Sequence, residues 1–303
     1  MIRSIEIHGV PMDLGANLRG VDMGPTALRI AGIESALTQL GFDVVDNDTL
    51  DIKSRVALPK DETRARYLDH IAEVCSTLHD IAKRAKSRGT IPLFLGGDHS
   101  LAIGTVSGVA DYYRERGEQI GLIWFDAHTD MNTPDTSPSG NIHGMPLAAL
   151  LGMGPGPLAD VGGWRGKVRP ENVFVIGARA VDASEKENVA ESGITVFSMK
   201  EVDALGMREV TRLAIEGASR NTVGFHLSFD IDGLDPDVAP GVGTPVRGGI
   251  NFREAHLFME LIADCERMTS LDVVELNPIH DVKNQTAEAV VHLVQSAFGR
   301  SIL

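Results

Sequence analysis

The sequence predicts an α/β fold in which a parallel sheet of about eight strands carries helices on both faces. Short apolar runs alternate with longer helical patterns along the chain. Continuous apolar runs, such as GLIWF at 121–125, are typical of strands that are buried on both faces. The 303 residues, 43% of them hydrophobic, suffice for the core of one large domain or of two modest ones.

The elements of the first half are predicted in the following order. The strand SIEIHGV precedes a helix at 25–40, which has a proline near its start and is followed by Gly41. The strand FDVVDN precedes a long amphipathic helix at 61–88, which Gly89 closes. The strand TIPLFLGGDHS, a helix at 101–116 and the strand QIGLIWFDAH complete this half.

The second half continues the alternation. The strand NVFVIGAR precedes a helix at 182–192, and ITVFSM precedes a helix at 199–220. The strand TVGFHLSFDID precedes a helix at 251–268, and TSLDVVELN precedes the last helix at 284–299. The Gly/Pro-rich stretch 152–166 is predicted to be a surface loop that connects elements rather than domains.

Two sheet architectures fit this order of elements. Eight βα units would suit a closed barrel. We favour an open, doubly wound sheet, because polar clusters follow only some of the strands, as expected around a switch point. The chain has no internal repeat and no low-complexity tract.

Composition narrows the classes of function. No apolar run approaches the ~18 residues that cross a membrane. The first ten residues resemble a strand rather than a signal peptide, and Cys75 and Cys265 lie far apart on predicted helices, so we expect a cytoplasmic protein without a disulfide framework. The formal net charge of −14 argues against a nucleic-acid partner and is typical of an acidic soluble surface.

Three predicted strands end in groups that could bind metal ions. LFLGGDHS supplies Asp98 and His99, IWFDAHTD supplies acids and a histidine on alternate residues, and LSFDIDGLDP supplies further acids. In an extended chain, residues two apart point to the same side, so each cluster could converge on one pocket. The candidate residues of the last two clusters are Asp126, His128, Asp130, Asp230 and Asp232, with Asp235 beyond them.

A single such residue has a simpler explanation. An aspartate at the end of a strand usually caps a helix or stabilises a turn, and Asp98 and Asp235 could do only that. Three clusters that all follow strands are harder to explain in this way. Burying four carboxylates together without cations is prohibitive, and two divalent ions would resolve the repulsion.

The residue types restrict the choice of ion. Aspartate and histidine without cysteine suit Mn²⁺, while Fe²⁺, Co²⁺ and Zn²⁺ also stay open. Bridging carboxylates would hold two ions about 3.5–4 Å apart, which is the geometry of two-metal hydrolysis.

The motifs GGDHS, DAHTD and SFDIDGLDP resemble the three metal-binding signatures of the ureohydrolase family, and within it the chain resembles the arginases, the bacterial ones in particular. The resemblance extends from GVPMDLGANLRGVDMGPTALR to VVELNPIHD. It implies a single domain over 1–303, a three-layer α/β/α sandwich with an eight-stranded, mainly parallel sheet. It also implies two Mn²⁺ ions per subunit and hydrolysis of L-arginine to L-ornithine and urea through a metal-bridging hydroxide.

The resemblance assigns the metal ligands residue by residue. One ion would be bound by His99, Asp126, Asp130 and Asp230. The other would be bound by Asp126, His128, Asp230 and Asp232. Asp126 and Asp230 would then bridge the ions, in agreement with the alternation argument.

The resemblance also implies the residues that act on the guanidinium group. Glu275 matches the glutamate that binds the guanidinium, although a strand-end ion pair would explain it without the resemblance. His143 matches the proton-shuttle histidine, for which a pKa near neutrality is suitable. Asp130 has a second candidate role, in passing the proton of the hydroxide to the leaving nitrogen.

The resemblance implies that the loop NTPDTSPSGNIHG and the segment GARAVDASE bind the amino-acid end of the substrate. Asn132, Ser139 and Asn141 match the residues that hold the α-carboxylate, although spacing alone would favour ordinary turn chemistry for the last two. Asp182 matches the acid that faces the α-ammonium group, and Glu185 could assist it.

Two positions depart from the family pattern. Ala180 stands where an acidic residue is expected, and Arg247 replaces an apolar residue. Both could alter the surroundings of the amino-acid end and so the affinity for substrate. The resemblance further implies a homo-oligomer, a trimer or a hexamer.

Three other functions stay open at this stage. Another ureohydrolase, such as an agmatinase or a guanidinobutyrase, would act on substrates that lack the α-carboxylate, the α-amine or both. A deacylase of the related deacetylase fold would use one Zn²⁺ and would not need all six ligands. A metal-loaded structural or regulatory protein is the remaining alternative, although no proposed ligand is missing.

Overall fold

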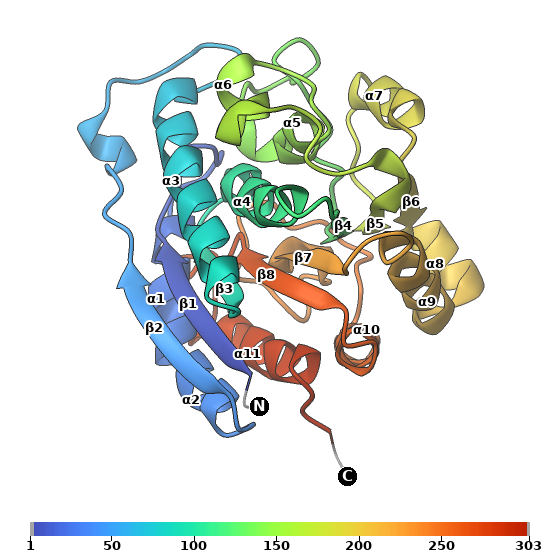
Figure 1. Cartoon of the computed structure of the whole chain (residues 1–303). Helices are drawn as coiled ribbons and strands as arrows, with labels where there is room; N and C mark the ends of the chain where they lie inside the picture. Colours follow the sequence, from blue (N-terminus) through green and yellow to red (C-terminus); the bar gives the residue numbers. More distant parts are fainter. Residues whose placement is uncertain (1–2, 302–303) are drawn as a thin grey trace.

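The computed structural model describes residues 3–301, and within them eight strands form one sheet with the order β2-β1-β3-β8-β7-β4-β5-β6 (Figure 1). All neighbouring strands are parallel. The sheet is open between the edge strands β2 and β6, which confirms the doubly wound sheet and excludes the barrel. The strands are β1 (Ser4–Val10), β2 (Asp43–Thr49), β3 (Ile91–Gly96), β4 (Gly121–Phe125), β5 (Val173–Ala178), β6 (Thr195–Ser198), β7 (Phe225–Asp230) and β8 (Met268–Val274).

Helices cover both faces of the sheet, which gives the three layers (Figure 1). One face carries α3 (Leu68–Ser87), α4 (Ala102–Arg114), α5 (Pro146–Leu150) and α6 (Gly156–Ala159). The other carries α1 (Gly24–Ile30), α2 (Ile33–Thr38), α8 (Met199–Leu205), α9 (Met207–Ala218), α10 (Phe252–Asp264) and α11 (Gln285–Ala297). The short helix α7 (Glu185–Ser192) precedes β6.

Each face of the sheet has its own apolar core, because side chains alternate along the strands. On β4, Leu122 and Trp124 belong to the core under α3 and α4, whereas Ile123 and Phe125 belong to the core on the opposite face. All four side chains are fully buried. Burial on both faces explains why this strand is a continuous apolar run.

Two predicted helices are each divided in two. The helix expected at 25–40 is interrupted at Gly32, whose φ of 87° ends α1 and starts α2. The helix expected at 199–220 is interrupted at Gly206, which has a φ of 79°. A left-handed φ cannot continue a right-handed helix, and glycine adopts it without steric penalty, so both single-helix predictions are wrong at these positions.

Two further predictions are wrong in part. The helix expected from residue 61 begins at Leu68, because the Asp61 carboxylate accepts hydrogen bonds from the backbone N–H groups of Thr63 (2.8 Å) and Tyr67 (2.7 Å) and stabilises a turn. The stretch 152–166 is not only a surface loop. It contains α6, and Leu158 is fully buried.

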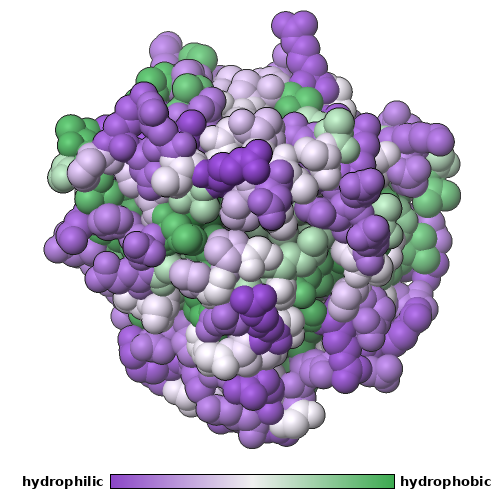
Figure 2. All heavy atoms as spheres, turned by 90° about the horizontal axis from the view of Figure 1, so that it is seen from above, coloured by the Kyte–Doolittle hydropathy of each residue, from purple (hydrophilic) through white to green (hydrophobic). Residues whose placement is uncertain are grey.

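The surface is in keeping with the composition. Figure 2 shows hydrophilic side chains over most of the face seen from above, with hydrophobic ones in small separate groups. No helix within residues 3–301 combines the length and the apolar character that crossing a bilayer requires. Cys75 and Cys265 are free thiols, as the sequence predicts.

The strand order brings the three ligand clusters to one edge of the sheet. The strands β3, β4 and β7 precede these clusters, and their carboxyl ends meet at the same edge because all the strands are parallel. The strand β8 lies between β3 and β7 and brings the residue that follows it, Glu275, to the same edge.

Candidate metal centre

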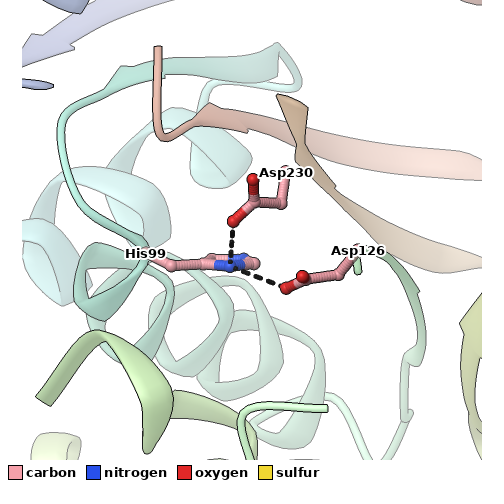
Figure 3. Close-up of side chains that lie close together, drawn as sticks. All are labelled: His99, Asp126 and Asp230. Atoms are coloured by element: carbon pink, nitrogen blue, oxygen red, sulfur yellow. Dashed lines mark ion pairs between the residues drawn. The ribbon is translucent and has the colours of Figure 1, made fainter. Parts of the chain in front are cut away.

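His99 lies at the centre of the first group of candidate ligands. Its Nδ1 atom is 3.2 Å from Asp126 Oδ2, 3.1 Å from Asp130 Oδ2 and 3.0 Å from Asp230 Oδ2. Figure 3 shows that Asp126, just after β4, and Asp230, at the end of β7, point toward the imidazole of His99. The ligand atoms of His99, Asp126 and Asp230 lie within 4.8 Å of one another, close enough for one ion to bind to all three.

A second group shares Asp126 with the first. His128 Nδ1 lies 3.3 Å from Asp126 Oδ1 and 3.1 Å from Asp232 Oδ2. The two carboxylate oxygens of Asp126 therefore face different histidines. This is the arrangement expected of a carboxylate between two ions.

The ligands converge for a reason that differs from the alternation argument. The strand β4 ends at Phe125, so Asp126, His128 and Asp130 lie on the bend that follows it rather than on an extended strand. Asp130 has a φ of 51°, in the left-handed region that few non-glycine residues adopt. This bend brings Asp130 Oδ2 to 3.1 Å from His99 Nδ1.

The β7 cluster is built by a short turn. Asp230 is the last residue of β7, and Asp232 lies in the 3₁₀ turn η7 (Ile231–Gly233). The backbone N–H of Asp232 donates to Asp230 Oδ1 over 2.8 Å, which fixes the relative position of the two carboxylates. Thr244 Oγ1 donates to Asp232 Oδ2 over 2.8 Å and orients it further.

Two residues that were not predicted from the sequence, Ser228 and Trp124, hold His99 in place. Its Nε2 atom is 2.7 Å from Ser228 Oγ, and its ring stacks on Trp124 with centroids 4.0 Å apart. The indole N–H of Trp124 donates to Asp126 Oδ2 over 2.9 Å. Trp124 and Ser228 stand two positions before the ligands Asp126 and Asp230, which is the sequence signal that could have identified them.

Burial makes the centre electrostatically unfavourable unless cations are present. Asp126, Asp130, Asp230 and Asp232 are each at most 5% exposed. Burial together with neighbouring carboxylates raises the pKa of Asp130 to about 7 and raises the pKa of Asp230 well above its ordinary range.

The donor set fits two divalent cations. His99 Nδ1 and Asp130 Oδ2 are buried and have no hydrogen-bond partner within the described chain, although both point into the cluster. Four carboxylates could carry four negative charges, which two divalent ions would balance. Aspartate oxygens with imidazole nitrogens suit Mn²⁺ and neighbouring transition metals.

His143 and Glu275 form a pair beside the metal-ligand clusters. His143 Nδ1 is 3.1 Å from Glu275 Oε1, and the same oxygen accepts the backbone N–H of His99 over 2.9 Å. Glu275 is 2% exposed and has a φ of 66°, which turns the chain sharply after β8. Burial lowers the pKa of His143, but the neighbouring carboxylates, Glu275 foremost and then Asp130 and Asp98, together outweigh burial and raise that pKa to about 9.

This pair predicts a pH-dependent stability. The pKa of His143 rises from 6.5 to about 9 on folding, so the stabilisation is complete below pH 6.5 and is lost as the pH rises through 9. In chelator-treated protein, we expect Glu275→Gln to lower the melting temperature by several degrees at pH 6 and by much less at pH 10. Glutamine keeps an acceptor for the His99 N–H, so the variant isolates the charge.

Thermal unfolding followed by circular dichroism at a series of pH values measures this effect. Glu216→Gln serves as the control, because Glu216 is 57% exposed on α9 and lies outside the candidate centre. A difference between wild type and Glu275→Gln that grows as the pH rises would contradict the assignment.

A cavity of about 420 Å³ opens onto the metal-ligand clusters. This volume is within the range of small-molecule sites, which is about 300–1,000 Å³. Five of the six predicted ligands line it, and the sixth, Asp126, lies behind them. All the residues predicted for the amino-acid end also line it, namely Asn132, Ser139, Asn141, Asp182 and Glu185, together with His143.

The residues at the outer part of this cavity are connected to one another. Asn132 Nδ2 donates to Asp182 Oδ2 over 3.1 Å, which links the two predicted segments. Both carboxylate oxygens of Glu185 are engaged, since the backbone N–H groups of Met131 (2.9 Å) and Asp182 (3.1 Å) donate to them. Glu185 is thus placed to hold the loop after β4 against α7. Ser137 and Thr244 also line the cavity, although neither was predicted from the sequence.

The two remaining aspartates, Asp98 and Asp235, stabilise turns and belong to neither group of clustered ligands. Asp98 caps the turn that begins at His99, and its carboxylate accepts the backbone N–H groups of Ser100 (3.0 Å) and Gly15 (2.8 Å). Asp235 accepts backbone N–H groups at 237, 248 and 249. Ala180 lines the cavity, whereas Arg247 is exposed and does not.

Comparison with known proteins connects this geometry to one family. The family model described as "Arginase family" matches residues 3–299. The chain is 48% identical to the arginase of Bacillus caldovelox over 303 residues, and 48% identical to that of Brevibacillus brevis over 306 residues, with all of each chain covered. The solved structure of the Bacillus caldovelox arginase matches with a TM-score of 0.95 over 100% of both chains.

Proposed function

Because this chain belongs to the arginase family, we propose that it hydrolyses the guanidinium group of L-arginine to give L-ornithine and urea. The observation that carries the proposal is the shared cavity. A single space of about 420 Å³ is lined both by the clustered aspartates and histidines and by the hydrogen-bonding groups of two loops. The first set can hold hydrolytic cations, and the second can hold an amino-acid head group.

We infer that the cations are two Mn²⁺ ions per subunit, bound by His99, Asp126, His128, Asp130, Asp230 and Asp232. The unpartnered His99 Nδ1, the two-sided placement of Asp126 and the buried negative charge support this inference. When bound, such a pair supplies a nucleophile derived from water near neutral pH and polarises the group under attack.

The chain's own residues would orient the guanidinium and move protons. Glu275 is buried next to His143, and we propose that it receives the guanidinium, which a carboxylate binds through paired hydrogen bonds. His143 lines the cavity and would deliver a proton to the leaving amine. Asp130, also on the cavity wall, would accept a proton from the attacking group and pass it to the leaving nitrogen.

The residues at the outer part of the cavity would bind the amino-acid end of the substrate. Asn132, Ser139 and Asn141 offer neutral donors to an α-carboxylate, and Asp182 offers a negative charge to an α-ammonium group. Asn132 and Asp182 are hydrogen-bonded to each other, so both charges of the amino-acid head would meet one connected set of residues. Glu185 would assist mainly by holding the loop at Met131.

The nearest alternative is a ureohydrolase for agmatine or guanidinobutyrate, and a panel of guanidino compounds separates it from our proposal. With Mn²⁺ added, we expect kcat/KM for urea release from L-arginine to exceed that from agmatine at least about 100-fold. The reason is that agmatine leaves the donors around Ser139 and Asn141 without an acceptor.

Colorimetric urea measurement over the panel gives the answer. A preference for agmatine or guanidinobutyrate would end the claim of arginine specificity. Counting the metal ions bound per chain tests the deacylase alternative, because one Zn²⁺ would suit a deacylase and two Mn²⁺ suit the proposal.

The wider properties of the protein follow the same reasoning. We propose that residues 1–303 act as one domain, since both cores are built on one sheet, although residues 1–2 and 302–303 lie outside the described chain. We also propose a homo-oligomer, a trimer or a hexamer, as the resemblance of the sequence to the arginases implies. Two free thiols are consistent with a cytoplasmic location.

A further inference from the structure

Arg66 connects the segment before α3 to the loop that forms the outer part of the cavity. Its backbone N–H donates to Gly140 O over 2.9 Å, and its Nη1 donates to Asn141 Oδ1 over 3.0 Å. Arg66 does not line the cavity itself, but Asn141 does. One residue thus binds both the backbone and the side chain of this part of the loop.

The hydrogen bond from Arg66 determines which way the amide of Asn141 points. A guanidinium group only donates, so it can bind the oxygen of an amide and never its NH₂ group. With Oδ1 engaged by Arg66, the Nδ2 group of Asn141 keeps its donors free of partners within the described chain. Asn141 is 3% exposed, so its amide has few other orientations.

The two segments approach each other so closely that this contact is rigid. Gly140 has a φ of 74°, and a Cβ at this position would lie 2.6 Å from Thr63 O. On the other side, the Asp61 carboxylate fixes the turn by accepting from the N–H groups of Thr63 and Tyr67. Tyr67 is 6% exposed and anchors the start of α3.

The charge of Arg66 interacts with the Asp61 and Glu62 carboxylates of its own segment, but at a distance beyond that of an ion pair. The half-buried guanidinium forms no ion pair with a carboxylate of residues 3–301, and its Nε is buried without a hydrogen-bond partner. No lysine or arginine lines the cavity, whereas three of the clustered aspartates do, namely Asp130, Asp230 and Asp232. An anionic substrate group near Asn141 would therefore benefit from a fixed positive charge directly behind the amide.

We propose that Arg66 is a positioning residue for the α-carboxylate of the substrate. It holds the Asn141 amide with its NH₂ group toward the cavity and places a positive charge behind it. The inference rests on the proposed function, since it assigns Arg66 to the amino-acid end of L-arginine. It makes the segment before α3 part of substrate selection.

The test compares substrates that differ only at this end. With Mn²⁺ present, Arg66→Met should raise KM about tenfold for L-arginine and for argininic acid, which both carry the carboxylate. The kcat values should change less than about threefold, because the guanidinium end is untouched. Agmatine lacks the carboxylate, so its KM, or its inhibition constant if turnover is too slow, should stay within about twofold of wild type.

Arg64→Met is the matched control, because Arg64 lies two residues away with its side chain 70% exposed. Arg66→Lys should recover only part of the affinity, since lysine keeps the charge but not the planar donor group. If Arg66→Met does not fold, Arg66→Gln replaces it in the same comparison.

Two outcomes would overturn the inference. An unchanged KM for L-arginine would show that Arg66 has no role in binding, and an equal loss for L-arginine and agmatine would show a general structural role. Both are distinct from failure of the proposed function, which would be seen as an absence of urea release from L-arginine by the wild-type protein.

Discussion

Replacing Asp126 with alanine should lower kcat for urea release from L-arginine at least about 100-fold and remove both bound cations. Loss of a group that only supports a metal ligand already reduces affinity or activity about 10–100-fold. Asp126 faces both histidines, with Oδ2 3.2 Å from His99 Nδ1 and Oδ1 3.3 Å from His128 Nδ1. Its removal therefore takes one ligand from each of the two groups at the same time.

The measurements are steady-state urea release and the metal content per chain after gel filtration. Asp135→Ala is the control, because Asp135 lies on the same loop with its side chain 94% exposed. Thermal unfolding of the chelator-treated variant checks that it folds. Full urea release by a folded Asp126→Ala protein would refute the proposed centre.

Chelation should abolish urea release and lower the melting temperature by about 10 °C. Two ions, each present at about 100 times its dissociation constant, together stabilise the folded state by roughly 5 kcal/mol. For a chain of this size, each kcal/mol is equivalent to a few degrees in Tm. The reason lies in the cluster, where four aspartates at most 5% exposed repel one another when no cation is present.

Differential scanning calorimetry with a chelator, and then with an excess of Mn²⁺, Mg²⁺ or Zn²⁺, measures this dependence. We expect Mn²⁺ to restore both the melting temperature and the activity. A melting temperature that chelation and added metal leave unchanged would show that the aspartate cluster does not bind structural cations.

The strands were predictable because their signal is local. Each of the eight was expected within a few residues of its observed position. For inner strands such as β4, burial on both faces requires an uninterrupted apolar run like the one that includes Trp124. The ligand clusters were predictable for a related reason. Parallel strands have their carboxyl ends at one edge of the sheet, so the aspartates that follow β4 and β7 necessarily lie close together.

The helix boundaries were less predictable because tertiary contacts and single glycines decide them. The amphipathic pattern before Leu68 suits a helix, yet the Asp61 carboxylate binds two backbone N–H groups and holds a turn there. Gly32 and Gly206 each divide a pattern that looks continuous. Propensity does not reveal which glycine adopts a left-handed φ.

The supporting residues of the centre were missed because their roles come from contacts across the fold. Ser228 reaches the His99 imidazole from another strand, and Thr244 reaches Asp232 from a loop. Thr244 belongs to no acidic or histidine-rich motif, and Ser228 begins the motif SFDIDGLDP without being a candidate ligand itself. Arg66 is a clearer case, since 75 residues separate it from the asparagine that it orients.

The position of β8 has a consequence for the time at which the centre can form. This strand lies between β3 and β7 in the sheet, yet it is the last of the eight to be synthesised. On a translating ribosome, β3, which precedes His99, therefore has no neighbouring strand on the side of β7 until residue 274 has left the exit tunnel. Cation capture by the complete cluster is thus an event of the finished polypeptide, and premature termination before β8 leaves the aspartates without the histidine that they surround.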